Sequence, residues 1–218
     1  FRSNMKKASC SLAVRRCKRT SLTAGVVAGW LAAVAIAAGG GVRADNDISE
    51  RETAAREVAA AFIQGLGTAL KNEMGKGGPA AAISVCKEIA PDIAGKLSRT
   101  HGWRVTRVGT RVRNPMLGLP DVWEQQVLGH FVERAGRNES FKDMVYSEVV
   151  SEPNGRYYRF MQAIGVQELC LTCHGPKDQI PQSVRDALAR HYPADQATGY
   201  RLGELRGAIS IKQPLSKP

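Results

Sequence analysis

The feature that most constrains this chain is the five-residue run Cys170-Leu171-Thr172-Cys173-His174. Two cysteines at this spacing, followed directly by a histidine, form the attachment sequence of a c-type haem. Each thiol can form a thioether with one former vinyl group of the porphyrin, and the adjacent imidazole can bind the iron as its proximal ligand. We therefore predict one covalently attached haem c, bound through Cys170, Cys173 and His174, with His174 as an iron ligand.

Other cysteine sites use the same spacing, and three of them stay open as alternatives. A Cys-x-x-Cys pair alone also occurs in thioredoxin-like redox sites, in zinc sites and in structural disulfides. A thioredoxin-like pair is expected near the start of its domain, after a strand, whereas this pair comes late in the chain. A four-ligand zinc site needs a second ligand pair, and the sequence has none at similar spacing. The adjacent histidine favours haem, and so does the secretory leader predicted over residues 1–44.

The first 44 residues have the composition of a secretory leader. A region rich in Lys and Arg over residues 6–19 precedes an uncharged run over 22–42 that ends in Val42-Arg43-Ala44. This order is typical of a signal peptide and predicts cleavage after Ala44. An uncleaved membrane anchor is the alternative, because a span needs roughly 20 apolar residues. We expect a periplasmic protein with a leader over 1–44 and one domain over 45–218, with membrane contact only if the leader is retained.

The net charge of +11 is concentrated in that leader. Its 44 residues hold eight of the 31 Lys and Arg and no acidic residue, so the remaining 174 residues carry a net charge of +3. That part of the chain has no basic patch with interleaved aromatic residues. Nucleic-acid binding is therefore not expected. A chain of this length can form one domain with a hydrophobic core.

Hydrophobic periodicity predicts helices first and antiparallel strands later, which indicates an α+β domain. We expect a flexible polar tail over 45–50, helices over 51–72, 79–97, 120–134 and 183–191, and strands over 103–112, 144–150, 156–164 and 205–213. Residues 75–79 should end the first helix, and Pro91 should kink or split the second. Residues 152–155 should form a hairpin turn.

Several residues are assigned to particular positions in these elements. Gly109 should mark a bulge in its strand. The buried face of helix 120–134 should contain Val122, Leu128 and Phe131. Alternation in the last strand predicts two opposite faces, with Leu205, Ile209 and Ile211 on one and Arg206, Ser210 and Lys212 on the other.

Four ordered segments together resemble the c-type haem family of small exported domains with a PAS-like fold. The segments are 82–91, 113–124, 169–175 and 192–211, and within the second the run 116–118 is less polar than the family pattern. The resemblance spans nearly all of the exported part. It implies a central antiparallel sheet flanked by helices, with the haem held against the sheet. It also implies that Cys86 is the distal iron ligand, opposite His174.

The residues alone do not determine which side chain is the distal ligand. Cys86 lies on an apolar helical stripe, where a free cysteine is more often a small buried hydrophobe. As a thiolate ligand it would stabilise ferric iron and lower the reduction potential. The sixth position could also be empty, or be filled by one of the rival side chains Met74, Met116, Met144, Met161, His101, His130 and His191.

Arginines are candidates for binding the haem propionates, because a guanidinium suits bidentate contact with a carboxylate. Arg113 is the residue we select, with Arg111 and Arg206 as further candidates; solvated strand edges are the alternative for each.

The predicted function is that of a single-haem redox protein, which carries electrons or reports redox state to an unknown partner protein. A haem-based sensor of redox state, NO or CO that acts through a partner is the alternative. One haem motif and no evident distal acid–base pair argue against an enzyme such as a peroxidase.

Overall fold

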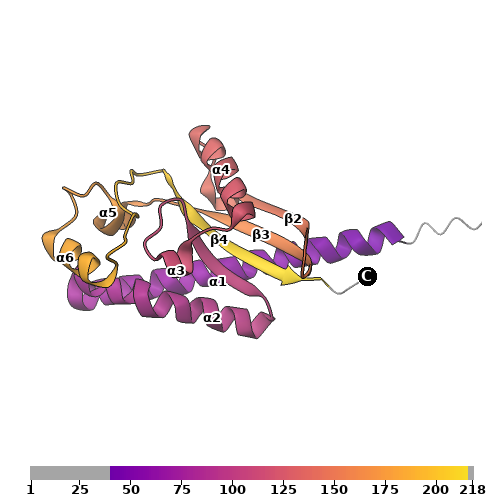
Figure 1. Cartoon of the computed structure of the whole chain (residues 1–218), viewed down its shortest axis with the longest axis horizontal. Helices are drawn as coiled ribbons and strands as arrows, with labels where there is room; N and C mark the ends of the chain where they lie inside the picture. The colour runs from indigo at the N-terminus through magenta and orange to yellow at the C-terminus, as the bar shows by residue number, and fades with distance from the viewer. Residues whose placement is uncertain (1–39, 216–218) are drawn as a thin grey trace, which may run out of the picture. The chain divides into compact units, whose positions relative to one another are not determined.

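A four-stranded antiparallel sheet organises this protein, whose computed structural model describes residues 40–215 (Figure 1). The strands are β1 (Arg104–Gly109), β2 (Val145–Glu152), β3 (Gly155–Gly165) and β4 (Leu205–Pro214), in the spatial order β1-β4-β3-β2. The last strand in the sequence therefore lies inside the sheet, between the first and the third. The predicted α+β class, with an antiparallel sheet flanked by helices, is confirmed.

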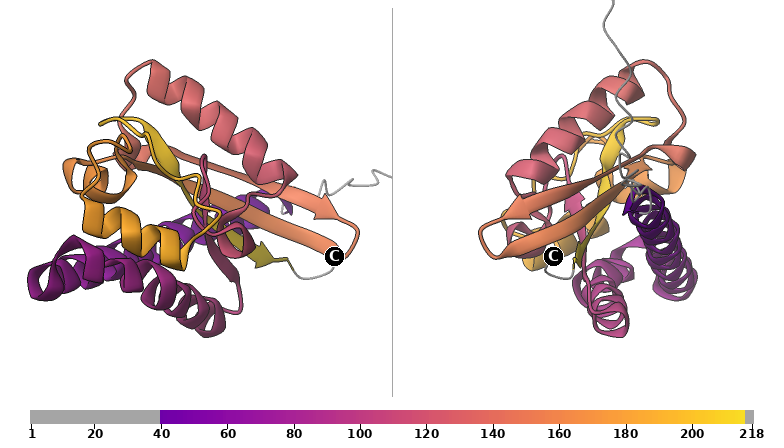
Figure 2. Two further views of the ribbon diagram at one scale, coloured as in Figure 1. Left: turned by 60° about the vertical axis from the view of Figure 1, so that its left-hand side comes forward. Right: turned by 90° about the vertical axis from the view of Figure 1, so that its right-hand side faces the viewer.

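Helices cover both faces of this sheet (Figure 2). Helices α1 (Gly40–Ala81) and α2 (Ala90–His101) lie on one face, and α4 (Val122–Gly136) lies on the other. The core on the α1 side consists of Ala55, Val58, Ala59, Phe62, Val105, Tyr158, Phe160, Ile209 and Ile211. The core on the α4 side consists of Val108, Val127, Leu128, Phe131, Met144, Met161, Ala163, Leu205 and Ala208. Because β4 contributes to both cores, it is buried on both faces, as a central strand should be.

The expectation of a flexible tail over 45–50 is wrong, since α1 already begins at Gly40. An ion pair of 3.0 Å joins Arg51 to Asp47 one turn earlier, and Ile48 packs against the core. The predicted break near residues 75–79 is confirmed at Gly78, whose φ of 73° and ψ of −174° interrupt the helix. Within residues 40–215, no helix is both long and apolar enough to cross a membrane. Most of the predicted leader lies outside the described residues.

The predicted helix over 79–97 is divided, as the proline suggested. A π-helix, η1 (Val85–Ile89), precedes α2, and Pro91 stands in the first turn of α2. A proline is tolerated there because its missing N–H would have no partner within the helix. Cys86 therefore lies in a short π-helical segment, a feature that sequence periodicity did not predict.

One prediction about the strands is confirmed and two need correction. The β2–β3 hairpin is confirmed, with Glu152 opposite Gly155. The bulge expected at Gly109 is wrong: β1 ends there, and the register shift lies between Ile164 and Gly165 of β3. Leu205 does not share a face with Ile209 and Ile211 but packs in the α4-side core. The left-handed φ of 153° at Gly207, beside the register shift, breaks the alternation between them.

Helix α4 begins as its sequence predicts but with a different inward face. Asp121 caps the helix and Glu124 completes a capping box with it. Leu128 and Phe131 are buried, whereas Val122 is 72% exposed and was wrongly assigned to the core. Ser210, assigned to the face opposite Ile209 and Ile211, is buried because β4 is an inner strand of the sheet.

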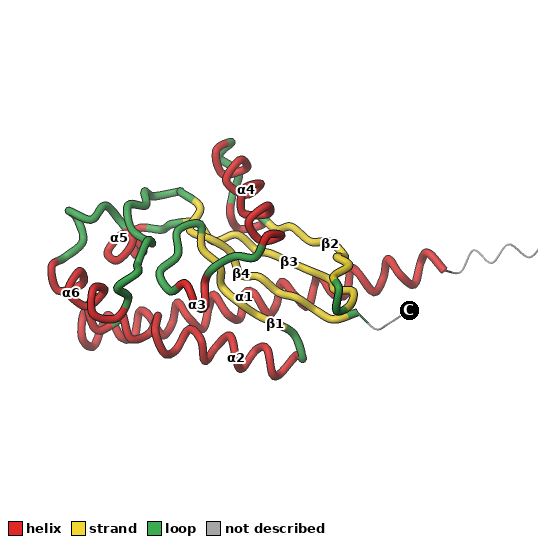
Figure 3. Tube along the Cα trace, in the orientation of Figure 1, coloured by secondary structure: helices red, strands yellow, loops and turns green. Residues whose placement is uncertain are grey.

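The segment between β3 and β4 forms a separate lobe at one end of the sheet (Figure 3). It contains α5 (Glu168–His174) and α6 (Gln182–His191), and α6 packs against α1. Hydrogen bonds from the Val166 amide to the Glu204 carbonyl, 2.8 Å, and from the Gly203 amide to the Val166 carbonyl, 3.0 Å, close its base. The short helix α3 (Pro115–Gly118) follows β1, and the 3₁₀ turn η2 (Phe141–Asp143) precedes β2. The Cys-x-x-Cys-His run, residues 170–174, forms most of α5, which follows the end of β3.

Candidate functional site

The three cysteines of the described residues lie in or near this lobe as free thiols. Cys170 packs with Val166 and Tyr200, while Cys173 packs against a cluster formed by Ile83, Ile180 and the buried side of α6. Burial raises the pKa of Cys173 to about 11, although the charge of Arg113 opposes that shift. The Cys173 side chain is therefore a neutral thiol at neutral pH.

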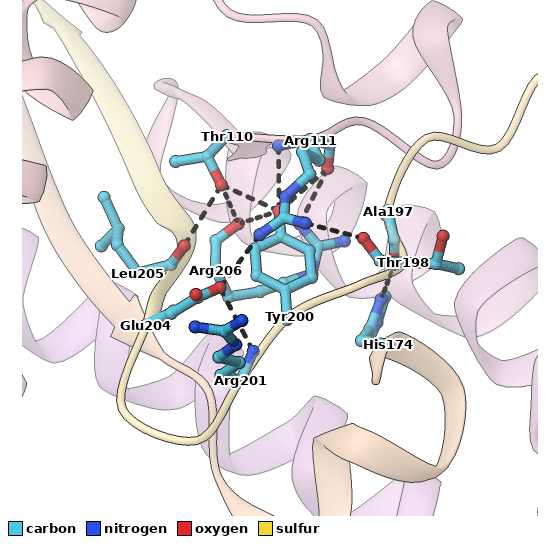
Figure 4. A network of polar contacts seen from close by, with 10 residues as sticks. All are labelled: Thr110, Arg111, His174, Ala197, Thr198, Tyr200, Arg201, Glu204, Leu205 and Arg206. Carbon is cyan, nitrogen blue, oxygen red and sulfur yellow. Dashed lines mark hydrogen bonds and ion pairs between the residues drawn. The ribbon is translucent and has the colours of Figure 1, made fainter. Parts of the chain in front are cut away.

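His174 is held in one orientation by the loop that returns toward β4. Its Nδ1 lies 2.6 Å from the carbonyl oxygen of Ala197, and Figure 4 shows this contact. A carbonyl can only accept a hydrogen bond, so Nδ1 must carry the proton and Nε2 keeps its lone pair. Burial lowers the pKa of His174 well below its usual value, and the positive charges of Arg206 and Arg113 add to this effect. The neutral imidazole with a free Nε2 is the form that binds metals.

A cavity of about 240 Å³ lies between η1, α2 and the edge strand β1. His174 is not among its lining residues, but Arg113 lines it and donates a hydrogen bond to the Cys173 carbonyl of the α5 motif. Cys86 lines the cavity, together with Tyr192 and side chains from the segment that follows β1. The volume is below the roughly 300–1,000 Å³ typical of small-molecule sites, so a ligand as large as a porphyrin would extend beyond it. Burial raises the pKa of Tyr192 to about 12, and Cys86 is close enough to contribute to that shift and to the one at Cys173.

Among the candidate distal ligands, Cys86 is the one that lines the cavity. The others are distributed elsewhere in the described part of the chain: Met144 and Met161 are buried in the α4-side core, Met116 is 89% exposed, Met74 is half-buried on α1, and His101, His130 and His191 are on the surface. The structure thus brings Cys86 close to Cys173 of the α5 motif, and none of the rival side chains lines the cavity.

Arg113 connects the motif to the cavity. Its guanidinium pairs with Asp195 at 3.1 Å and donates from Nη2 to the carbonyl of Cys173 at 2.6 Å. A longer contact of 3.4 Å runs from Nη2 to the Ala197 carbonyl, the same oxygen that holds His174. The side chain is only 5% exposed, so the alternative of a solvated strand-edge arginine is wrong for Arg113. Its Nη1 is buried with no hydrogen-bond partner among the described residues.

Tyr200 is the centre of a polar network that fixes the returning loop, and sequence reasoning missed it (Figure 4). Its hydroxyl lies 2.8 Å from Thr110 Oγ1 and accepts from the Arg111 amide at 2.9 Å. The Arg111 guanidinium lies 3.8 Å from the centre of the Tyr200 ring, and the His174 ring meets that ring edge-on at 6.1 Å. These contacts join residues about 90 positions apart, so no local pattern could have revealed them. The network positions the loop that holds His174.

Comparison with known proteins places this architecture in context. A profile of the family described as Tll0287-like matches residues 41–214. A solved structure described as that of the cyanobacterial heme-protein Tll0287 is similar, with 25% sequence identity and a TM-score of 0.54. The match covers 79% of this chain and 98% of that one. A search of curated proteins gives no match.

Proposed function

Because the chain belongs to the Tll0287-like family, we propose that it is an exported, single-haem c-type cytochrome that exchanges electrons with a partner protein or reports redox state to it. The similarity to a protein described as a heme-protein supports haem binding. Covalent attachment, the ligand set and export are the finer parts of the proposal, and each has its own support in the residues.

The observation that carries the proposal is the state of His174. Its Nδ1 proton is committed to the Ala197 carbonyl, and its depressed pKa keeps the ring neutral, so Nε2 is available to iron. This arrangement, in which a backbone carbonyl orients a histidine ligand, recurs in metal sites. When bound, the haem would supply a one-electron iron couple.

The two cysteines of α5 suit covalent attachment. Addition of a thiol across a vinyl group forms one sulfur–carbon bond and transfers the thiol hydrogen to the other vinyl carbon, so no oxidant is needed. Cys170 and Cys173 are both free thiols, as this addition requires. Within the described residues, the buried Arg113 Nη1 and Arg206 Nε have no hydrogen-bond partners. An anionic group bound in the cavity that these arginines line would supply the missing hydrogen-bond acceptors.

Cys86 is the distal ligand in this proposal. It lines the cavity beside the motif, and a thiol beside ferric iron ionises readily to the ligating thiolate. Thiolate donation stabilises ferric iron, which gives a low reduction potential.

One observation favours the alternative of a redox or gas sensor. Cys86 belongs to the five-residue π-helix η1, and π-helical segments are rare and concentrated at functional sites. A π-helix can convert to the α-helical form with a shift of its side chains, so η1 offers a route by which Cys86 leaves the iron. A released sixth position would then be open to NO or CO.

Absorption spectroscopy of the mature protein distinguishes these functions. A six-coordinate, low-spin spectrum in both oxidation states that is inert to CO supports electron transfer. Loss of the sixth ligand on reduction, with rapid CO binding, supports the sensor. A spectrum of the Cys170→Ser/Cys173→Ser variant is the control, because its haem should be extractable by acid and organic solvent.

Export has a separate test. Fractionation of cells that express the full chain should recover the haem protein in the periplasm, with an N-terminus at Asp45. Recovery in the membrane at full length would support the uncleaved anchor, and recovery in the cytoplasm would contradict export.

A further inference from the structure

The cavity beside the α5 motif is lined by basic side chains and no acidic ones. Its arginines are Arg107, Arg111, Arg113 and Arg206. Two of them are neutralised from outside the cavity, Arg113 by Asp195 at 3.1 Å and Arg111 by Glu204 at 2.9 Å. Within residues 40–215, neither Arg107 nor Arg206 has a carboxylate within 4.0 Å. The cavity therefore holds two positive charges that the described residues do not compensate.

The backbone around Arg206 makes room for its guanidinium. A Cβ at Gly109 would lie 2.8 Å from both the Arg111 carbonyl oxygen and Arg206 Nη1, and the backbone oxygen cannot move aside as a side chain can, so glycine is needed where these two groups meet. Gly207, next in the chain, has a φ of 153°, and a Cβ there would meet the Val108 carbonyl at 2.1 Å. Arg206 Nη1 donates to the Arg111 carbonyl at 3.1 Å, while Nε stays buried without a partner. Two restricted glycines thus accompany a largely buried cation that lacks a counter-charge.

Such a cation costs free energy unless an anion accompanies it. Burial lowers the pKa of Arg206, and the nearby positive charge of Arg107 lowers it further, so Arg107 adds to this cost. A ligand that carries two carboxylates would neutralise both guanidinium groups and could use the unpaired Nε as a donor. Haem is a ligand of this kind, since it bears two propionates.

We propose that Arg107 and Arg206 form the carboxylate-binding pair of this site and receive the two propionates of the haem, an assignment that rests on the proposed haem-binding function. Arg113 then has a different role from the one that the sequence predicted. Its Nε and Nη2 hold Asp195 and the Cys173 carbonyl, so it positions the α5 motif. Arg107 was not selected from the sequence, because only the fold brings strand β1 beside Arg206.

Resonance Raman spectroscopy of the mature haem protein tests this pair, because the propionate-bending band reports the hydrogen bonds to those carboxylates. We compare wild type with Arg107→Gln and Arg206→Gln. The matched control is Arg104→Gln, which removes an exposed arginine from the same strand β1 that does not line the cavity. Both cavity variants should shift the band and move the midpoint potential negative, because a cation near the haem favours the reduced iron. The Arg104→Gln band should match that of wild type.

The mass of each sample separates failure of this pair from failure of the proposed function. If wild type carries covalent haem and neither glutamine variant shifts the band, the pair is wrong while haem binding stands. If wild type has no haem, the proposed function itself fails. Where Arg206→Gln yields no haem protein, Arg206→Lys should restore it by keeping the charge. If Arg206→Lys also yields none, Arg107→Gln decides: a shifted band supports the pair, and an unchanged band overturns it.

Discussion

Two arginine clusters in this protein differ in what surrounds their charge. Arg159 of β3, only 3% exposed, lies close to the carboxylates of Asp121 at 2.7 Å, Glu124 at 3.4 Å and Glu152 at 3.6 Å. The charge of Arg159 is compensated by carboxylates of the fold, although its Nε is also buried without a hydrogen-bond partner, whereas the cavity arginines Arg107 and Arg206 have no carboxylate partner within residues 40–215. The contrast separates a cluster whose charge is balanced within the fold from the pair that we propose binds an anion.

The largest effect on stability should come from removing Arg159 from its cluster of carboxylates. Arg159→Met leaves Glu124 buried without its counter-charge, and removal of one partner from a buried ion pair costs about 3–5 kcal/mol. Urea unfolding of the haem protein measures the loss. Arg137→Gln, which breaks the exposed pair with Glu139, should cost much less, because solvent screens the two charges. Equal losses in the two variants would contradict the distinction between these pairs.

Replacement of Cys86 tests whether this residue is the distal ligand of the haem iron. Cys86→Ala should change the ferric absorption spectrum and raise the midpoint potential, by on the order of 100 mV within the roughly 800 mV over which axial ligands act. Met116→Ala, at an exposed rival side chain, should leave both unchanged. An unaltered ferric spectrum in Cys86→Ala would remove Cys86 from the ligand set.

A smaller effect on stability is expected from removing the hydroxyl of one of two buried tyrosines, Tyr200 and Tyr158. Tyr200→Phe removes a hydroxyl that contacts Thr110 Oγ1 and the Arg111 amide, and should cost about 1–2 kcal/mol of unfolding free energy. Tyr158 is equally buried, but its hydroxyl has no hydrogen-bond partner among the described residues. Tyr158→Phe should therefore be close to neutral. If the two variants lost equal stability, the Tyr200 network would not hold the loop.

The smallest effect is the pH dependence of the cluster of carboxylates around Arg159. Partial burial raises the pKa of Asp121, but its hydrogen bond with Arg159 and the Glu124 amide outweigh this and hold that pKa below 3.8. A carboxylate with a lowered pKa stabilises the fold above its unfolded pKa, and the contribution is lost as pH falls through the folded value. Wild type should therefore lose stability below about pH 4 more steeply than Asp121→Asn, as urea unfolding across pH measures. Parallel curves would argue against this linkage.

Local chemistry accounts for what the sequence predicted correctly. The β2–β3 hairpin follows from its turn residues, and the start of α4 follows from the capping pair of Asp121 and Glu124. Each of these features is determined by residues a few positions apart, so a single sequence suffices to predict it.

What the sequence did not predict depends on packing between distant segments. Glu124 reads as an exposed acid in a first turn, yet it is buried because Arg159, 35 positions later, lies beside it. Arg107 and Tyr200 gain their significance only when β1 and the returning loop come together. The early start of α1 likewise rests on tertiary contacts of Ile48, which no helix propensity encodes.

The most direct test of the account is the mass and absorption spectrum of the full chain, produced in a host competent for cytochrome maturation. The account predicts one covalently bound haem per chain, with a low-spin ferric spectrum, and no covalent haem when Cys170 and Cys173 are both replaced by serine. A colourless protein at the mass of the unmodified chain would contradict it.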